Sequence, residues 1–367
     1  MKKFLHLFLL SFCFLLLNIS TVFSQSPVKL FPEVAKKFPA PEAVLNNSAQ
    51  GKDFWFVFPM NDNPNAPLNA LEVYVTGSSN TVVNLEVPGA GFSRKKALRA
   101  LDVVTFSTRD GSISPSWEVN SNEIPDDIAI HVFADAPVSV YVLSAKPVTS
   151  EGYLALPTSV WGTEYIHCSY YDFLEFGKWA TGMCIVASED DTEVSIYLRG
   201  KGGSIAKTSK GTKLGTTTKV LLMKGQVYNI KGDATTRGVF DMSGSKIVSN
   251  KPVGLISYHQ RCMIPANNTS GRDHISEMLP PVQAWGKKYA TVEYSRDNKG
   301  DFFRIIASQN NTRWKMKYYD KVTGKILGNR EGNLQAGEFY EEINQWGGMG
   351  AVNPFEVHLY GKLINQY

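Results

Sequence analysis

The chain has 367 residues, of which 43% are hydrophobic and 20% are charged, and its formal net charge at pH 7 is +4. This weak charge argues against nucleic acid as the main partner, because phosphate binding requires a concentrated basic face. Four cysteines in this length exclude a disulfide-rich scaffold, so a hydrophobic core must stabilise the fold.

Residues 1–24 have the pattern of a signal peptide. Lys2 and Lys3 form a basic start, residues 4–17 are apolar except at His6 and Ser11, and small residues precede position 25. The apolar run is shorter than the ~20 residues that cross a bilayer, so we expect no stable membrane span after cleavage. Cleavage leaves 343 residues with a charge of +2, a length at which single cores usually divide. We expect a secreted, extracellular or cell-surface protein, with the periplasm as an alternative location.

Residues 25–50 are rich in Pro, Ala and Asn and are interpreted as a linker. From Gly51 onward, apolar residues alternate with others in short runs, such as residues 71–75 and 81–87, and clusters of Gly, Asn and Ser separate the runs. This alternation predicts antiparallel strands. Helical periodicity extends over no more than about two turns anywhere. The sequence therefore predicts an all-β fold.

Three segments of the chain resemble one another. Gly51-Lys-Asp-Phe-Trp corresponds to Gly162-Thr-Glu-Tyr and to Gly286-Lys-Lys-Tyr, and a second phrase shared by Val75 and Val186 has the same offset of 111 residues. A shared offset indicates repeats. We predict three homologous, antiparallel, β-sandwich-like repeats at residues 51–148, 149–272 and 273–367. Half-repeats of about 50 residues also fit a β-propeller with two blades per repeat, which remains the alternative.

Shorter phrases mark turns and joints within these repeats. Asp190-Asp and Asn310-Asn are predicted to be hairpin turns, because these residues tolerate left-handed backbone. The second and third repeats begin with similar sequences, Leu156-Pro-Thr-Ser-Val-Trp-Gly and Leu279-Pro-Pro-Val-Gln-Ala-Trp-Gly. We expect the tryptophans of both phrases to lie in the core near the joints between repeats.

Two cysteines are placed together by a predicted hairpin. Residues 163–171 and 181–188 are interpreted as its strands, with the turn centred on Phe176. In this register Cys168 and Cys184 face each other at about 4.5–5.5 Å. We therefore predict that they lie close together and are candidates for a disulfide, which leaves Cys262 unpaired.

One region is dense in reactive side chains: His259, Cys262, Asp273, His274 and Glu277. A catalytic interpretation makes Cys262 a nucleophile with a histidine as its base. A metal site of the two histidines and a carboxylate is another interpretation. The region has none of the established zinc, hydrolase or redox spacings, so we favour hydrogen bonds that hold a loop. We expect no catalytic residue, cofactor or metal, with an exported hydrolase or metal-dependent enzyme using His259–Glu277 as the alternative.

The same region contains a long insertion, residues 260–272, where most connections have about 4–6 residues. Long loops on rigid sheets often carry recognition residues, and arginine with aromatic residues is typical of binding hot spots. We predict that this loop and its flanks bind the ligand through Tyr258, His259, Arg261, Arg272 and His274. A plain linker between repeats is the alternative interpretation.

Several phrases together resemble the N-terminal domain family of the IgG Fc-binding protein. They are residues 51–59, 153–165, 186–192, 244–253, 258–260 and 273–281, so the resemblance covers roughly residues 50–320. This family occurs in a mucus protein of animals and in exported bacterial proteins. The resemblance implies a secreted or cell-surface binding or adhesion module, with a glycoprotein or mucin-like partner. The family often has a cysteine where this chain has Arg272, so the resemblance gives Cys262 no partner across the loop. A structural protein of an envelope or surface layer is the second alternative.

Overall fold

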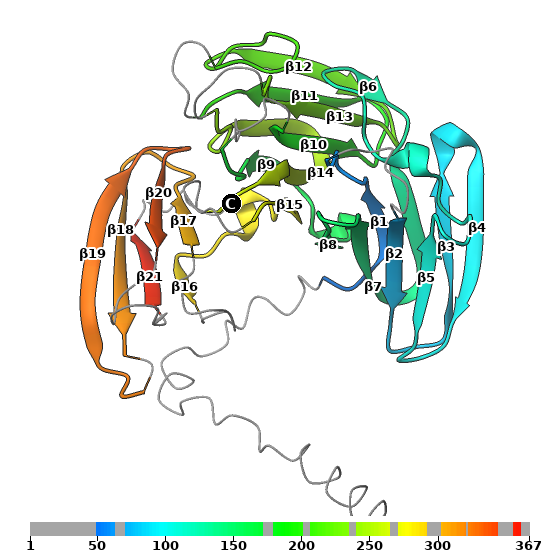
Figure 1. Ribbon diagram of the computed structural model, residues 1–367, viewed down its shortest axis with the longest axis horizontal. Coiled ribbons are helices and arrows are strands. Elements are labelled where there is room, and N and C mark those ends of the chain that lie inside the picture. The colour runs from blue at the N-terminus through cyan, green and yellow to red at the C-terminus, as the bar shows by residue number, and fades with distance from the viewer. Residues whose placement is uncertain are drawn as a thin grey trace, which may run out of the picture. The chain divides into compact units, whose positions relative to one another are not determined.

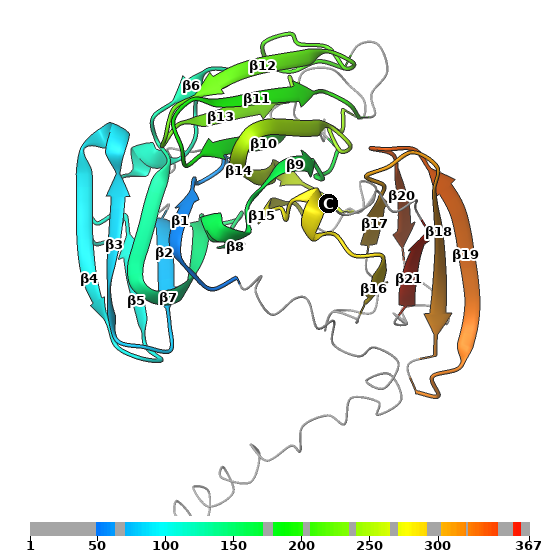
Figure 2. The same ribbon diagram turned by 180° about the vertical axis from the view of Figure 1, so that it is seen from behind.

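The computed structural model describes residues 49–62, 70–171, 179–200, 206–234, 240–264, 271–291, 302–320, 322–343 and the backbone of 355–360. All described elements belong to the compact unit 48–367. They are antiparallel strands and short 3-10 turns, without an α-helix in these ranges (Figures 1 and 2). The predicted all-β antiparallel fold is therefore confirmed. The predicted signal peptide, and the linker apart from its last two residues, lie outside the described residues.

The strands fall into three groups along the chain, which we call the first, second and third strand groups. The first contains β1 (Gly51–Phe56), β2 (Ala70–Thr76), β3 (Thr81–Val87), β4 (Phe92–Leu98), β5 (Val103–Ser107), β6 (Pro125–Asp126), β7 (Ile130–Ala145) and β8 (Glu151–Ala155). The second contains β9 (Gly162–Ile166), β10 (Thr181–Ala187), β11 (Thr192–Tyr197), β12 (Thr217–Leu222), β13 (Val227–Lys231), β14 (Lys246–Cys262) and β15 (Asp273–Met278). The third contains β16 (Lys288–Ala290), β17 (Phe302–Ile306), β18 (Thr312–Tyr319), β19 (Ile326–Leu334), β20 (Phe339–Ile343) and β21 (Phe355–Tyr360). Short 3-10 turns connect them: η2 (Pro88–Ala90), η3 (Pro115–Trp117), η4 (Thr158–Val160) and η6 (Val282–Ala284).

The long strand β7 organises the first strand group. Its first part pairs with β1 and β3, and β4 follows β3; its second part pairs with β2 and β8, and β5 follows β2. Pro137 lies between the two parts, where its missing N–H removes no ladder bond from either. A strand that passes from one sheet to another at a bend is typical of packed sheets, and this favours the sandwich over separate blades.

The second strand group repeats the strand order of the first, and the third strand group repeats it in part. Before Pro252, β14 pairs with β11 and with most of β9, whose Gly162 pairs with Val253; after Pro252, β14 pairs with β10 and β15. β12 follows β11, and β13 follows β10. The third group has the order β16-β21-β18-β19, and a separate β17-β20 pair. These correspond to β1-β7-β3-β4 and β2-β5. The predicted limits of the repeats, at residues 149 and 273, remain a prediction. Strands β8 and β15 begin near these limits, but β8 pairs with β7 and β15 pairs with β14, each in the strand group before the limit.

The predicted turns at Asp191 and Asn311 form, but they do not close hairpins. Both residues have positive φ, 51° and 58°, as left-handed turn residues do. The strands on either side do not pair with each other: β10 pairs with β13 and β14, whereas β11 pairs with β12 and β14. β17 and β18 likewise lie in different sheets. These turns therefore carry the chain between the two halves of each group.

The predicted hairpin that would join Cys168 to Cys184 is wrong. β9 pairs with β14, and the strand partners of Cys184 are Asn229 on β13 and Ile256 on β14. Strands β9 and β10 each pair with the long strand β14 and not with each other, so the predicted register between Cys168 and Cys184 does not form. Cys168, Cys184 and Cys262 are free thiols.

The joints between groups explain the repeated opening phrase. Pro157 packs on Gly51, and Pro281 packs on Gly162, so closely that an added Cβ would lie 2.3 Å and 2.5 Å from the proline Cβ. The tryptophan of each phrase, Trp161 or Trp285, donates its Nε1–H to the carbonyl five residues earlier, at 3.0 Å and 3.2 Å. Glycine is needed at the first position because the next group's proline occupies the side-chain space.

Arg304 of β17 joins the third group to the second. Its Nη2 lies 2.8 Å from Asp241 Oδ2 and 2.6 Å from Glu341 Oε1, and its side chain is 6% exposed. The guanidinium lies 4.5 Å from the ring centroid of Phe339 and 4.7 Å from that of Tyr170. A buried cation is tolerated here because carboxylates and ring faces replace its water.

Candidate functional site

The structure separates the predicted ligand-binding residues into buried and surface positions. Tyr258, His259 and His274 have 0% exposed surface, whereas Arg261 and Arg272 are partly exposed. The three buried residues lie on the paired strands β14 and β15. Tyr258 and His259 follow one another on β14 and point to opposite faces, and both are buried because residues 253–260 of this strand are covered on both faces. The middle of the predicted loop, residues 265–270, lies outside the described residues. Tyr258, His259 and His274 therefore support the loop ends from beneath.

Hydrogen bonds hold the two histidines in place. His274 Nδ1 donates to the carbonyl oxygen of His259 at 2.7 Å, and His259 Nδ1 accepts the backbone N–H of Arg261 at 3.1 Å. Burial lowers the pKa of His259 to about 3 and the pKa of His274 to about 4. Both rings are neutral at physiological pH, so they act as fixed hydrogen-bonding groups that position Arg261.

The environment of Cys262 does not favour a reactive thiol. Cys262 is 3% exposed, and burial raises the pKa of its thiol well above the ordinary value. A thiol nucleophile needs the opposite environment, one that favours the thiolate and admits a substrate. Within the described part of the chain, His, Cys, Asp and Glu side chains form no group of three that could hold a metal ion.

Four side chains form a cluster above this buried layer, which we call the Trp179 cluster: Asp62, Trp179, Arg261 and Arg272. Trp179 Nε1 donates to Asp62 Oδ1 at 2.8 Å, and Arg261 Nη1 donates to Asp62 Oδ2 at 2.7 Å. The guanidinium carbons of Arg261 and Arg272 lie 5.0 Å and 6.0 Å from the Trp179 ring centroid. These are cation–π distances, and the two arginines are oriented by one ring.

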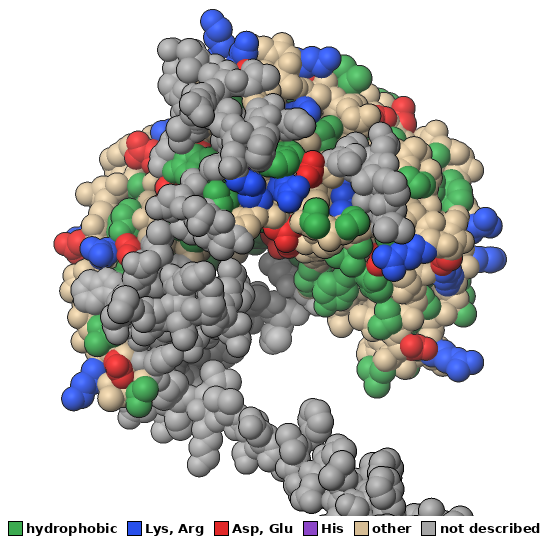
Figure 3. Space-filling view, viewed as in Figure 1, with side chains coloured by type: hydrophobic (Ala, Val, Ile, Leu, Met, Phe, Trp, Pro, Cys, Tyr) green, Lys and Arg blue, Asp and Glu red, His purple; other side chains and the backbone are tan. Residues whose placement is uncertain are grey.

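Three connections supply the Trp179 cluster. Asp62 follows β1, Trp179 precedes β10, and the arginines flank the connection from β14 to β15. Sequence reasoning missed Asp62 and Trp179, because Asp62 lies 199 residues from Arg261 and neither stands in the predicted loop. The available signal was weak: a tryptophan at the end of the connection between β9 and β10. Figure 3 shows basic, acidic and hydrophobic side chains interspersed on the face it presents.

A buried polar network fixes Asp62 from below. Lys146 Nζ lies 2.9 Å from Glu118 Oε2, with side chains 2% and 3% exposed, and it also donates to the Asp62 carbonyl at 3.2 Å. Asn61 donates its N–H to Glu118 Oε1 at 2.9 Å and its Nδ2–H to the Thr149 carbonyl at 2.9 Å. Burial raises the pKa of Glu118 and lowers that of Lys146, because each charge loses its water. The network ties the start of the β1–β2 connection to the β7–β8 connection.

Comparison with known proteins identifies the family. A sequence model described as IgGFc binding protein matches residues 151–358, more than half of the chain. The chain belongs to the IgGFc-binding protein family. IgGFc-binding protein of Homo sapiens is 31% identical over 218 residues, which are 58% of this chain and 4% of the human protein. The chain therefore corresponds to a small part of that relative, and no solved structure matches it.

The match to the IgGFc-binding protein family covers most of the Trp179 cluster. Trp179, Arg261 and Arg272 lie within residues 151–358, whereas Asp62 and the first strand group from β1 to β7 precede them. No helix of the described residues is long and apolar enough to cross a membrane.

Proposed function

We propose that this member of the IgGFc-binding protein family is a secreted or cell-surface binding and adhesion module, with an extracellular glycoprotein or mucin-like partner. Family membership supports a binding role, because the human relative is named as an IgGFc-binding protein. The signal-peptide pattern of residues 1–24 supports export. The buried thiol and neutral, buried histidines support binding over catalysis.

The Trp179 cluster is the observation that carries the proposal. Arg261 and Arg272 lie near the surface on one tryptophan, and Asp62 fixes the orientation of Arg261. An arginine that is already oriented loses little freedom when a ligand binds, and arginine beside tryptophan is a frequent hot-spot composition. Carboxylates, sulfates and hydroxyls of a glycoprotein are suitable acceptors for these guanidinium groups. We assign contact with the ligand to Arg261 and Arg272, and support to Tyr258, His259 and His274.

The proposal can be tested with the mature chain on immobilised IgG Fc and on immobilised mucin. Arg261→Ala and Arg272→Ala are each expected to weaken capture at least tenfold, about 1.4 kcal/mol, because hot-spot truncations typically cost more than this. Arg99→Ala is the matched control, because Arg99 is exposed on a turn of the first strand group.

The outcomes separate binding from folding. Thermal unfolding of each variant must be measured beside capture, since Arg261 also holds Asp62. Unchanged capture by both variants, at unchanged unfolding temperature, would place the ligand surface elsewhere. Equal losses for Arg99→Ala would show a general charge effect in place of a site.

A further inference from the structure

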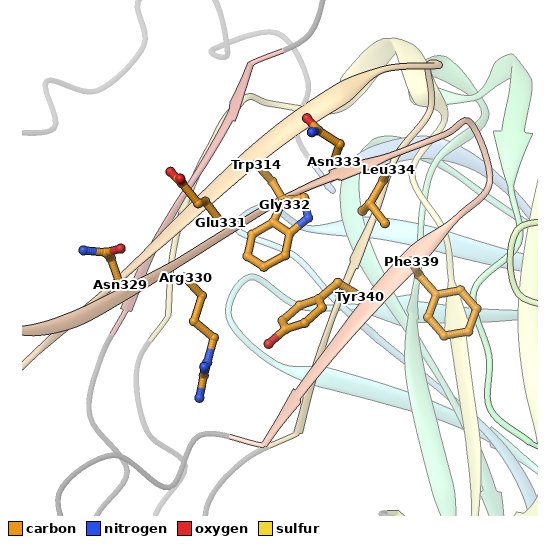
Figure 4. A pocket seen from close by; sticks show the side chains of 9 residues that line it. All are labelled: Trp314, Asn329, Arg330, Glu331, Gly332, Asn333, Leu334, Phe339 and Tyr340. Atoms are coloured by element: carbon orange, nitrogen blue, oxygen red, sulfur yellow. The ribbon is translucent and has the colours of Figure 1, made fainter.

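The third strand group contains a groove along its edge strand, which we call the β19 groove. It has a volume of about 490 Å³, lies between β19 and β20, and follows residues 329–334. Figure 4 shows Asn329, Glu331 and Asn333 directed away from the ring pair at the centre of the view, so these residues meet the groove through their main chain. The side chains that line the floor are those of Trp314, Arg330, Leu334, Phe339 and Tyr340.

The position that opens this groove carries a side chain in the other two groups. The hairpins β3–β4, β11–β12 and β18–β19 start with the same register, pairing Thr81 with Leu98, Thr192 with Leu222 and Thr312 with Leu334. Two residues before each leucine stand Lys96, Val220 and Gly332. Lys96 reaches Asp110 at 2.8 Å and lies 5.0 Å from the Phe106 ring centroid, and Val220 packs against the second core. Gly332 has no side chain at this position, so the groove there is lined by neighbouring residues such as Trp314.

Two aromatic rings form the floor beside Gly332. Trp314 lies directly opposite Gly332 in the ladder, and a Cβ on Gly332 would lie 2.8 Å from Trp314 Nε1. Trp314 packs against Tyr340 with ring centroids 4.4 Å apart. Trp314 is buried, but Tyr340 remains partly exposed, so the pair presents an apolar surface to the groove.

Among the described strands, none covers the sheet edge that forms the wall of the groove. Within the described residues β19 pairs with β18 alone, so the main-chain groups on its other edge face the groove. Edge strands are usually protected by lysine, proline or a covering segment. β4 has Arg94-Lys-Lys at its edge, whereas β19 has neither lysine nor proline in nine residues. Its one cation, Arg330, is held by Glu342 at 3.1 Å.

We propose that the β19 groove binds an extended peptide of a partner protein, which adds to β19 as a further strand and places one aromatic or aliphatic side chain on the Trp314–Tyr340 pair. Strand addition obtains affinity from main-chain hydrogen bonds and specificity from pockets for alternate side chains. Residues 329–334 span about 20 Å, at ~3.4 Å per residue, and accommodate five to seven peptide residues. The residues flanking the apolar one face outward beside Asn329, Glu331 and Asn333 and are polar. The groove lies in a different strand group from the Trp179 cluster, so this site is independent of the function proposed above.

The test uses the mature chain and three blocked heptapeptides. The first, Thr-Glu-Thr-Phe-Thr-Glu-Thr, has the proposed pattern; the second has alanine at the centre; the third is the first with alternate amides N-methylated. Titration followed by tryptophan emission and by hydrogen exchange of residues 326–334 reports binding and its location. We expect the first peptide to bind and to slow hydrogen exchange in β19. We expect the second and third peptides to bind at least tenfold more weakly.

A variant of the protein tests whether the aromatic floor and the open position at Gly332 are needed for binding. Trp314→Val with Gly332→Val rebuilds the pair Val194–Val220 of the second strand group, and it is expected to lose at least tenfold in affinity. Equal binding of the N-methylated peptide would overturn strand addition. Absence of binding and of exchange protection at 1 mM of the first peptide would also overturn the proposal. Gly332 would then serve only to make room for the large Trp314 side chain in the core. Protection by a mucin glycan without peptide would overturn the assigned ligand class.

Discussion

Replacing Lys146 with methionine is expected to destabilise the protein by about 3–5 kcal/mol, the usual cost of removing one partner of a buried ion pair. Lys146 and Glu118 are 2.9 Å apart with side chains 2% and 3% exposed, so solvent cannot replace the lost ammonium group. The Asn61 N–H still donates to the Glu118 carboxylate, but one neutral donor does not compensate its charge. Methionine has a similar length, which keeps the packing loss small.

The second partner isolates the charge effect. In the double variant Lys146→Met with Glu118→Gln no buried charge remains at this pair, and we expect it to recover most of the loss, since neutral replacements of buried pairs are often nearly neutral in stability. Burial already raises the pKa of Glu118, and loss of Lys146 raises it further. A carboxyl whose folded pKa lies above its unfolded value stabilises the fold at low pH, and this contribution is lost as pH rises. The single variant should therefore approach the wild type as pH falls towards 4.5.

Urea unfolding at pH 7 and pH 4.5 measures both effects. With a slope of about 3 kcal/mol per molar urea, the expected loss at pH 7 lowers the midpoint by about 1–1.7 M. A loss below 1 kcal/mol at pH 7, or a single variant equally destabilised at both pH values, would refute the reasoning that an unpaired buried carboxylate is the cause.

Three further predictions concern the joints and one carboxyl. Arg304→Ala should cost about 3–5 kcal/mol, because Asp241 stays buried without its cation; limited proteolysis should then cleave the third strand group first, and equal protection would contradict this. Gly162→Ala should lower the unfolding temperature, because its methyl group would meet Pro281, whereas Gly286→Ala should not, since no described atom lies within 3.5 Å of its Cβ position. Burial, with the nearby carboxylates of Asp273 and Glu277, raises the pKa of Glu151 to about 7, so its ionisation destabilises the fold as pH rises through 7. Glu151→Gln should therefore raise the thermal midpoint more at pH 8 than at pH 5, and an equal gain at both would contradict the cause.

The sequence predicts the strands of this fold better than their partners. Alternation in residues 71–75 and 81–87 depends on which side chains are buried, and β2 and β3 form there as expected. The turns at Asp191 and Asn311 also follow from local chemistry. Pairing depends on contacts across long stretches of chain, which local patterns do not contain. The assumption that neighbouring strands pair therefore failed for β9 and β10, which both pair with β14.

The candidate site shows the same division between local and distant information. Tyr258, His259 and His274 were predicted to bind the ligand because they flank the long connection, but the packing of β14 and β15 buries all three. Arg261 and Arg272 were found because they flank a long connection. Asp62 and Trp179, which orient Arg261, come from other connections and become visible only in the folded protein.

The shared strands β7 and β14 determine how the protein responds to a mechanical load. A strand held by β1 and β3 at one end and by β2 and β8 at the other cannot be peeled from one sheet alone, so tension along the chain must shear several ladders together. The second strand group has the same construction around β14. In the third group, the described residues of β21 pair with β16 and β18, and the β17–β20 pair stands apart. Under tension the third group is expected to unfold first and to lengthen the chain, while the first two groups keep their shape.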